Sequence, residues 1–287
     1  MHLKYRKNLL NRSRAGNVAV YLVLILVGAF LALPLVYALV TSLKPYEEIF
    51  IFPPRFYVVN PTTANFRDLF VLCSQSLMPF SRSVFNSVLV SLVVTVAHVA
   101  LSSMAAYPLA KNDFPGKDFL FSVIVGSLLF VGQVTALPQY ILMSKIGLIN
   151  TLWAVILPNI GSAMGLFLMK QFMEQIPLSI IEAPRIDGAT EFDIAFKIVF
   201  PNVKPAWLTL GLLIFQTAWN NTGATVLFDD SIKLLPTVLS EITTENALAR
   251  MGVGMAATVF LMIPPIAFFI ISQSKVVKTM AFAGIKE

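Results

Sequence analysis

The fold is decided by a polar interval, residues 171–205, which reads QFMEQIPLSIIEAPRIDGATEFDIAFKIVFPNVKP between stretches that are almost entirely apolar. Its charged residues are Glu174, Glu182, Arg185, Asp187, Glu191, Asp193, Lys197 and Lys204. Apolar residues still recur within it, first around Ile180 and Ile186 and then across 192–199. A solvated loop needs no such pattern, so we predict two short helices that lie against another surface. Gly188 stands between the two halves, where a chain reversal or a helix stop is expected.

The rest of the chain has the composition of a membrane protein. Of its 287 residues, 57% are hydrophobic and only 13% are charged, whereas soluble domains average about a quarter charged residues. Asp, Glu, Lys and Arg are absent from the segments 18–43, 83–110, 119–144, 146–169, 206–228 and 251–274. Each segment, as a helix, is long enough to cross about 30 Å of hydrocarbon.

We therefore predict an all-α integral membrane protein with six transmembrane helices. The spans are expected at residues 18–40, 84–107, 119–143, 152–169, 207–227 and 255–271. Two longer segments, 41–82 and 228–254, are expected on the outer face, and the polar interval lies between the fourth and fifth spans.

The distribution of basic residues predicts the orientation. If both ends of the chain are on the inner side, the inner segments contain fourteen Lys and Arg residues and the outer segments seven. An excess of basic residues marks the cytoplasmic side. Both termini and the polar interval are therefore expected in the cytoplasm, with 1–17 as a basic leader and 18–287 as the transmembrane domain. This asymmetry explains the net charge of +6 without a nucleic-acid partner.

Motifs for catalysis and metal binding are missing from the sequence. It has no GxxxxGK[ST] phosphate loop, no HExxH and no Cys/His cluster with metal spacing, so neither an enzyme nor a bound cofactor or metal is expected. The single Cys73 excludes an internal disulfide. The expected spans hold no acidic residue, which argues against an ion-coupled carrier, so transport is either passive or driven by a partner. His98, in the second span, is either a proton-relay or substrate group or a packed histidine bonded to a neighbouring helix.

The polar interval resembles the E-A-A-x-x-x-G loop of ABC importer permeases, through Glu182-Ala183, Gly188 and the later Pro201. The similarity covers nearly the whole chain. It includes SLKP at 42–45, NS at 86–87, AAYPLA at 105–110, GLINT at 147–151, WN at 219–220 and LP at 235–236. In these motifs the chain is similar to the second permease of carbohydrate importers of the maltose type, an inner-membrane component.

The resemblance implies one half of a channel in a bacterial plasma membrane. Such a chain pairs with a homologous permease, two copies of a cytoplasmic ATPase that bind ATP and Mg, and an extracytoplasmic sugar-binding protein. The solute would be a carbohydrate, in particular an oligosaccharide. The alternatives are a permease of the same kind for an amino acid or peptide, and a stand-alone secondary carrier.

The same resemblance implies that the E-A-A loop forms a coupling helix that enters a cleft on the ATPase. The residues that match or lie within the motif are Glu182, Ala183, Arg185, Asp187 and Gly188, and Glu182 would pair with a basic group of the ATPase. Pro184 stands where the family pattern has alanine. Because proline lacks a backbone donor, the helix either bends or begins late, or Pro184 is tolerated at its edge. Pro177 is placed as the first helical residue.

Polar side chains in the spans are the candidates for a substrate path. They are Gln133, Gln216, Asn220 and Asn221, with Trp219 beside the last two. Because an unpaired amide is costly in lipid, each of them either lines a water-filled path or bonds to a neighbouring helix.

Overall fold

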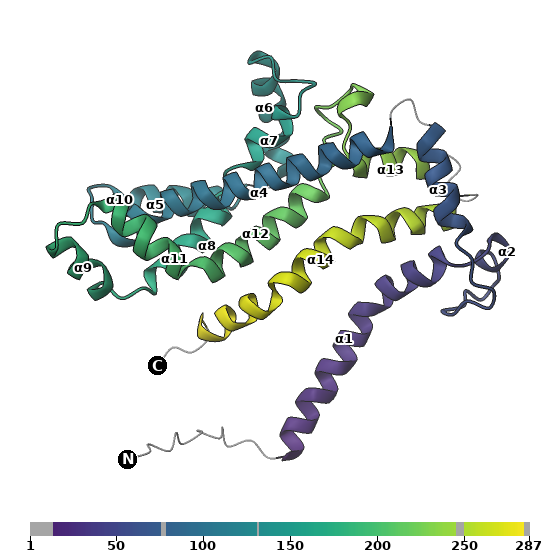
Figure 1. Ribbon diagram of the computed structural model, residues 1–287, viewed down its shortest axis with the longest axis horizontal. Helices are drawn as coiled ribbons and strands as arrows, with labels where there is room; N and C mark the ends of the chain where they lie inside the picture. The colour runs from purple at the N-terminus through teal and green to yellow at the C-terminus, as the bar shows by residue number, and fades with distance from the viewer. Residues whose placement is uncertain (1–13, 76–78, 131, 245–249, 284–287) are drawn as a thin grey trace. The chain divides into compact units, whose positions relative to one another are not determined.

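The computed structural model of the chain describes residues 14–75, 79–130, 132–244 and 250–283 (Figure 1). All regular structure in these residues is helical, as the sequence predicted. The chain divides into two compact units, Met1–Leu69 with Leu248–Val259, and Phe70–Ala247 with Phe260–Glu287.

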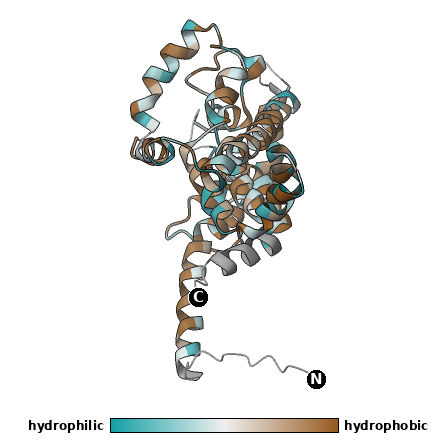
Figure 2. Cartoon of the chain, turned by 90° about the vertical axis from the view of Figure 1, so that its left-hand side faces the viewer, coloured by the Kyte–Doolittle hydropathy of each residue, from teal (hydrophilic) through white to brown (hydrophobic). Residues whose placement is uncertain are grey.

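The first unit contains the long apolar helix α1 (Arg14–Ser42) and the short helix α2 (Tyr46–Ile49). Most apolar side chains of α1 are exposed, and Figure 2 shows the helix as mainly hydrophobic along its length. A surface of this kind is stable only against lipid or another membrane helix.

Polar contacts of one asparagine order the segment after α1. Asn65, at the start of α3 (Ala64–Gln75), donates from Nδ2 to the carbonyl oxygens of Ser42 and Lys44, both at 2.8 Å. A Cβ atom at Gly252 would lie 2.3 Å from Asn65 Oδ1, so only glycine fits beside this side chain. Nearby, the backbone N–H groups of residues 59 and 60 donate to the Glu48 carboxylate, which lowers the pKa of Glu48.

The second unit is built on α4 (Phe80–Lys111), along which α8 (Ala163–Glu174) and α12 (Lys204–Trp219) pack (Figure 1). The buried serine and threonine side chains of α4 are Ser83, Ser87, Ser91, Thr95, Ser102 and Ser103. Several donate to carbonyl oxygens of their own helix, such as Thr95 Oγ1 to Ser91 O at 2.6 Å. Small side chains that satisfy their own polar atoms let neighbouring membrane helices approach closely.

Four described helical stretches are long and apolar enough to cross a membrane: Gly16–Ser42, Phe80–Lys111, Trp153–Glu174 and Met251–Gln273. The number rises to six if each of two bent pairs is one span. One pair is α5 (Lys117–Ser127) and α6 (Gly132–Lys145), bent by 102°, so the predicted third span is not one continuous helix. The other is Glu191–Asn202 and α12, bent by 73°.

The predicted fourth and fifth spans also differ from the structure. The fourth lies within Trp153–Glu174, which is one crossing stretch, but it is not a continuous helix: α7 (Trp153–Asn159) and α8 are separated at residues 160–162, because Gly161 favours a break and Ser162 caps α8. The fifth ends at Trp219 rather than at residue 227, since Asn221 and Gly223, with a φ of 63°, form a turn. The last helix, α14 (Met251–Ala283), is longer than predicted and continues through Pro264 and Pro265.

The N-terminal end of α4 is fixed to the segment after α12. The Ser87 hydroxyl accepts from the backbone N–H of Leu235 at 2.7 Å, where α13 (Leu235–Thr244) begins. The short helix η2 (Asp230–Ile232) precedes it, and Asn86 Nδ2 donates to Ser231 O at 3.2 Å. Lys233 pairs with Asp230 at 2.7 Å and with Glu241 at 2.9 Å, and these bonds raise the pKa of Lys233.

Candidate functional site

The polar interval forms a helical hairpin at one end of the bundle of α4, α8 and α12 (Figure 1). Its first half is α9 (Ser179–Ile186), and its second half is α10 (Glu191–Asp193), the π-helical segment η1 (Ile194–Val199) and α11 (Phe200–Asn202). The two halves meet at Gly188, whose φ is 85°.

The end of α9 explains why glycine occupies position 188. The Ala189 N–H donates to Pro184 O at 3.0 Å, and the Gly188 N–H donates to Arg185 O at 3.2 Å. This pair of bonds is the Schellman arrangement, in which the residue after the C-cap takes a left-handed conformation. A Cβ atom at Gly188 would meet nothing within 4 Å, so the need for glycine is conformational and not steric.

Pro184 does not interrupt α9, which runs without a break to Ile186. Of the two readings of Pro184, tolerance near the helix end is therefore the one that fits. Its missing N–H leaves the Ile180 carbonyl without its usual partner, while its own carbonyl completes the helix stop. Pro177 is not the first helical residue as predicted: α9 begins at Ser179, and Pro177 O instead accepts from the Ile180 N–H at 3.2 Å.

The residues that match or lie within the E-A-A motif are all solvent-accessible. Glu182, Ala183, Arg185, Asp187 and Gly188 are exposed. Among the described residues of α9, only Ile181 is buried, at 1% exposure. Ile181 is therefore the residue through which α9 packs on the core. The rest of the helix presents a mixed polar and apolar surface, which includes Ile186 at 86% exposure.

The second half of the hairpin is buried where the first is exposed. Ile194 and Val199 of η1, both fully buried, join a core with Met169 of α8 and Leu210 of α12. Thr190 caps this half, since its hydroxyl accepts from the backbone N–H of Asp193 at 3.2 Å.

Three polar side chains connect the hairpin to α4. Arg185 lies 2.6 Å from Glu191, and the Tyr107 hydroxyl donates to the other oxygen of the Glu191 carboxylate at 2.7 Å. Sequence analysis missed Tyr107 and Glu191, because nothing in the pattern pairs residues that stand 84 positions apart. The only available signal was the AAYPLA motif at 105–110, which contains Tyr107.

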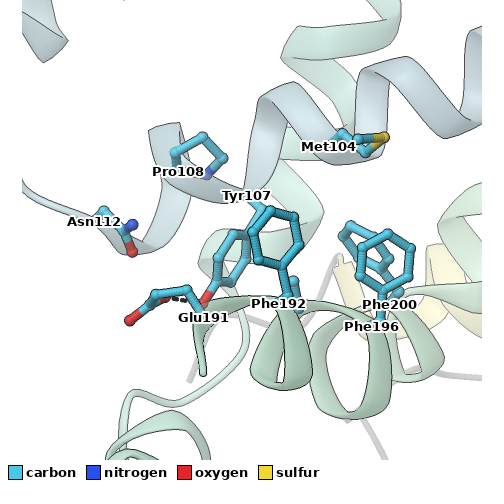
Figure 3. A pocket seen from close by; sticks show the side chains of 9 residues that line it. Met104, Tyr107, Pro108, Asn112, Glu191, Phe192, Phe196 and Phe200 are labelled. Carbon is cyan, nitrogen blue, oxygen red and sulfur yellow. Dashed lines mark hydrogen bonds between the residues drawn. The ribbon is translucent and has the colours of Figure 1, made fainter. Parts of the chain in front are cut away.

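A cavity of about 200 Å³ lies beside this bond, between α4 and the second half of the hairpin (Figure 3). Its walls are mainly aromatic and apolar, with Met104 and Pro108 on α4 and Phe192, Phe196 and Phe200 opposite. The polar groups that line it are those of the Tyr107–Glu191 bond and the Asn112 side chain (Figure 3).

The candidate path residues do not all gather in one place. Gln216, Trp219, Asn220 and Asn221 stand together at the end of α12, whereas Gln133 is exposed on α6. Trp219 is buried and donates from Nε1 to Leu261 O of α14 at 3.0 Å, which is a bond between helices. Gln216 and Asn220 are exposed.

His98 is a packed histidine, the second of its two predicted alternatives. Nδ1 lies 2.8 Å from Asn159 O, and Nε2 lies 3.1 Å from the Ser162 hydroxyl. Since a carbonyl only accepts, Nδ1 carries the proton and Nε2 accepts from Ser162. A Cβ atom at Gly165 would lie 2.3 Å from Nε2. The histidine thus satisfies a carbonyl that the break between α7 and α8 leaves free.

Within the part of the chain that the structure describes, no three His, Cys, Asp or Glu side chains are grouped so as to hold a metal ion. The hairpin presents charged, apolar and backbone groups on the short exposed helix α9.

Comparisons with known proteins agree with this picture. Residues 18–282 match the family described as "Binding-protein-dependent transport system inner membrane component". The arabinooligosaccharides transport system permease protein AraQ of Halalkalibacterium halodurans is 31% identical over 90% of this chain and 92% of its own length. The polygalacturonan/rhamnogalacturonan transport system permease protein YtcP of Bacillus subtilis is 30% identical over 77% and 76%.

The fold is similar to that of a chain in a bacterial ABC transporter involved in the import of the acidic polysaccharide alginate. The TM-score is 0.73 at 21% sequence identity, over 92% of this chain and 98% of the other. The family match covers most of the sequence, and the relatives named are permeases. The chain therefore belongs to the family of binding-protein-dependent transport system inner membrane components, and it is a permease subunit of an ABC transporter rather than an enzyme.

Proposed function

We propose that this chain is a membrane-spanning permease of an ATP-driven importer that moves a carbohydrate, in particular an oligosaccharide, into the cytoplasm. The observation that carries the proposal is α9, a short exposed helix bearing the E-A-A residues and supported by a buried second half. The names of AraQ and YtcP, which refer to arabinooligosaccharides and to polygalacturonan and rhamnogalacturonan, support a carbohydrate.

In this proposal α9 is the coupling helix. Glu182, Ala183, Arg185, Asp187 and Gly188 form the surface that enters the ATPase cleft, and Glu182 pairs with a basic group there. The exposure of these residues supports the assignment, because a docking surface has to be free in the isolated chain. The apolar side chain of Ile186 adds area that docking would bury.

The membrane topology in this proposal has six spans, with both termini and the polar interval in the cytoplasm. The bent pair α5–α6 counts as one broken span, and α12 is the membrane-crossing part of the second pair. The two-fold excess of basic residues on the inner side supports this orientation. Discontinuous helices are tolerated in membranes where protein or water satisfies the freed backbone groups.

The complete transporter contains this chain, a homologous permease, two copies of a cytoplasmic ATPase and an extracytoplasmic sugar-binding protein in a bacterial plasma membrane. ATP and Mg are bound by the ATPase chains and not by this one. The exposed apolar surface of α1 supports a membrane-embedded partner, because lipid or another helix must cover it.

Gln216, Asn220 and Asn221 line the substrate path in this proposal, with Gln133 as a further candidate on α6. The exposed Gln216 and Asn220 side chains support it, because amides turned away from the helix bundle are able to hydrogen-bond a sugar hydroxyl. Trp219 contributes by holding α12 against α14 through its indole N–H.

The docking assignment is tested by exchanging Glu182 for Gln and purifying the assembled transporter. We expect Glu182→Gln to lose most of its ATPase chains on size-exclusion chromatography while the permease remains folded. Asp118→Asn, also an exposed acidic residue near the inner end of a helix, serves as the matched control. Full retention of the ATPase in Glu182→Gln would contradict the assignment.

The solute is identified by thermal-shift screening of the associated binding protein against oligosaccharides, monosaccharides, amino acids and peptides. Stabilisation by an oligosaccharide is expected, because a ligand that binds only the folded protein raises its melting temperature. Stabilisation by amino acids or peptides alone would show that the transported solute is not a carbohydrate.

The topology is tested by membrane-impermeant thiol labelling of Asp193→Cys in a background where the buried Cys73 is replaced by Ser. Label should enter only from the cytoplasmic side. Labelling of intact cells from outside would overturn the orientation.

A further inference from the structure

The strongest unassigned feature is the polar link, which we define as Arg185 on α9, Glu191 on α10 and Tyr107 on α4. One carboxylate oxygen of Glu191 lies 2.6 Å from the Arg185 guanidinium, and the other accepts from the Tyr107 hydroxyl at 2.7 Å. Glu191 thus connects the exposed helix α9 to α4 through polar contacts on both of its carboxylate oxygens.

Few other contacts of α9 are positioned to connect it to α4. Ile181 is the only buried residue of α9 among those described. The chain then passes Gly188 before it reaches α10, and glycine gives this turn extra conformational freedom. One apolar anchor fixes where α9 lies but not how it is rotated, whereas a charge-assisted bond to an arginine is directional.

Packing next to the link is incomplete. The cavity of about 200 Å³ between α4 and the second half of the hairpin removes apolar contacts that would otherwise hold the two together (Figure 3). The hydrogen bond from Tyr107 to Glu191 crosses between the two elements at the edge of this cavity (Figure 3). The Tyr107–Glu191 hydrogen bond therefore helps to fix the position of the hairpin relative to α4, where close packing does not.

Tyr107 is well placed to pass a displacement onward. It is 6% exposed and lies four residues before the end of α4, which continues as one helix to Phe80. At about 1.5 Å per residue, a helix of 32 residues extends about 48 Å. Near its other end, Ser87 is bonded to Leu235 at the start of α13. The link thus ties α9 to a helix whose far end holds the predicted outer segment.

We propose that Glu191 is the positioning residue that couples α9 to α4, by holding Arg185 and Tyr107 on its two carboxylate oxygens. Displacement of α9 then moves α4 with it as one body. This inference rests on the proposed function of α9 as the docking helix, and it adds the route by which the movement enters the spans.

The proposal is tested in the assembled transporter by the distance between spin labels on α9 and α4. The labels replace Ile180 and Leu101, which are 43% and 46% exposed, in a Cys73→Ser background. Distances are measured by pulsed electron paramagnetic resonance without nucleotide and after trapping with ATP, Mg and vanadate. The variants are Glu191→Gln and Tyr107→Phe. The matched controls are Glu47→Gln and Tyr140→Phe, at positions with no ion pair or side-chain hydrogen bond among the described residues.

With the native link we expect a narrow distance distribution that is the same in both nucleotide states. In Glu191→Gln the distribution should broaden about two-fold and shift on trapping, because a neutral amide replaces the charge-assisted bond. Tyr107→Phe should show a smaller change in the same direction, and the controls none. A residue needed only for folding would lower the yield of the complex without making the distance depend on nucleotide.

Two results would overturn the proposal. One is a Glu191→Gln distribution that stays narrow and equal in both states, and the other is a nucleotide-dependent distance when the link is intact. If Glu191→Gln does not assemble, Tyr107→Phe tests the same bond through the loss of one hydroxyl. If Glu182→Gln retains the ATPase, only the docking assignment is contradicted. The distance between the labels at positions 180 and 101 without nucleotide still reports whether Glu191 holds α9 to α4.

Discussion

The two halves of the polar interval both combine apolar and charged residues but differ in environment. Of the described residues in α9, all but Ile181 are at least partly exposed, whereas η1 buries Ile194, Ala195 and Val199 in the core shared by α4, α8 and α12. Both halves looked alike in sequence, as apolar patterns interrupted by charges. The exposed residues of α9 are accessible to a partner, whereas the buried residues of η1 attach the interval to the helix bundle.

In the proposed function, this contrast gives one loop both an exposed surface for a partner and a fixed attachment to the bundle. The buried half secures the loop to the bundle through apolar area, and the exposed half is attached mainly by Ile181 and the polar link. Changes in the buried half should therefore act on folding, and changes in the exposed half on partner binding.

The largest effect is expected from a charge placed in the buried half. Val199→Asp should destabilise the permease by roughly 4 kcal/mol or more, because the carboxylate would have no partner in the core. Ile186→Asp in α9, at a position that is 86% exposed, is the control from the first half and should leave the melting temperature in detergent nearly unchanged. Equal melting temperatures for the two variants would contradict the prediction that the second half, and not the first, contributes to folding stability.

The next effect concerns the junction. Gly188→Val should cost about 1–2 kcal/mol of stability in the turn, because a β-branched residue strongly disfavours a φ of 85°. Gly188→Asn should cost less, since asparagine tolerates this conformation. The readout is ATPase retention during purification, which should fall more for Val than for Asn. If both variants retain the ATPase fully, the turn does not set the position of α9.

A smaller effect is expected at the start of the second half. Thr190→Ala removes the hydroxyl that caps α10 and should cost about 1 kcal/mol. Thr190→Ser keeps the cap and should behave as the native protein in a thermal unfolding assay. A loss of stability in Thr190→Ser equal to that in Thr190→Ala would mean that the methyl group, rather than the cap, is what matters.

The smallest effect is expected at Pro184. Pro184→Ala restores a backbone donor inside α9 and should stabilise the helix by about 1 kcal/mol or less, the net value of one hydrogen bond. ATPase association, measured by titration of the ATPase onto the purified permease, should be preserved or slightly stronger. A marked loss of association would show that docking requires the proline itself.

Local rules predicted much of the site. The glycine at 188 identified the helix stop, and the apolar recurrence in both halves of the interval predicted two short helices. The same rules placed α9 two residues too early, because Pro177 fits a first helical position as well as it fits the turn before one. They also extended the fifth span past Trp219, since uncharged residues 220–227 satisfy hydropathy whether they form helix or turn.

The sequence by itself determined the membrane class, the helical content and the place of the polar interval, because hydropathy and the positions of glycine and proline act locally. Only the tertiary structure decided which half of that interval is buried, why His98 is packed, and that Glu191 meets Tyr107. These depend on contacts between residues far apart in the chain, such as the 84 positions that separate Tyr107 and Glu191. The physical reason is that burial and side-chain hydrogen bonding are properties of packed helices and not of any one segment.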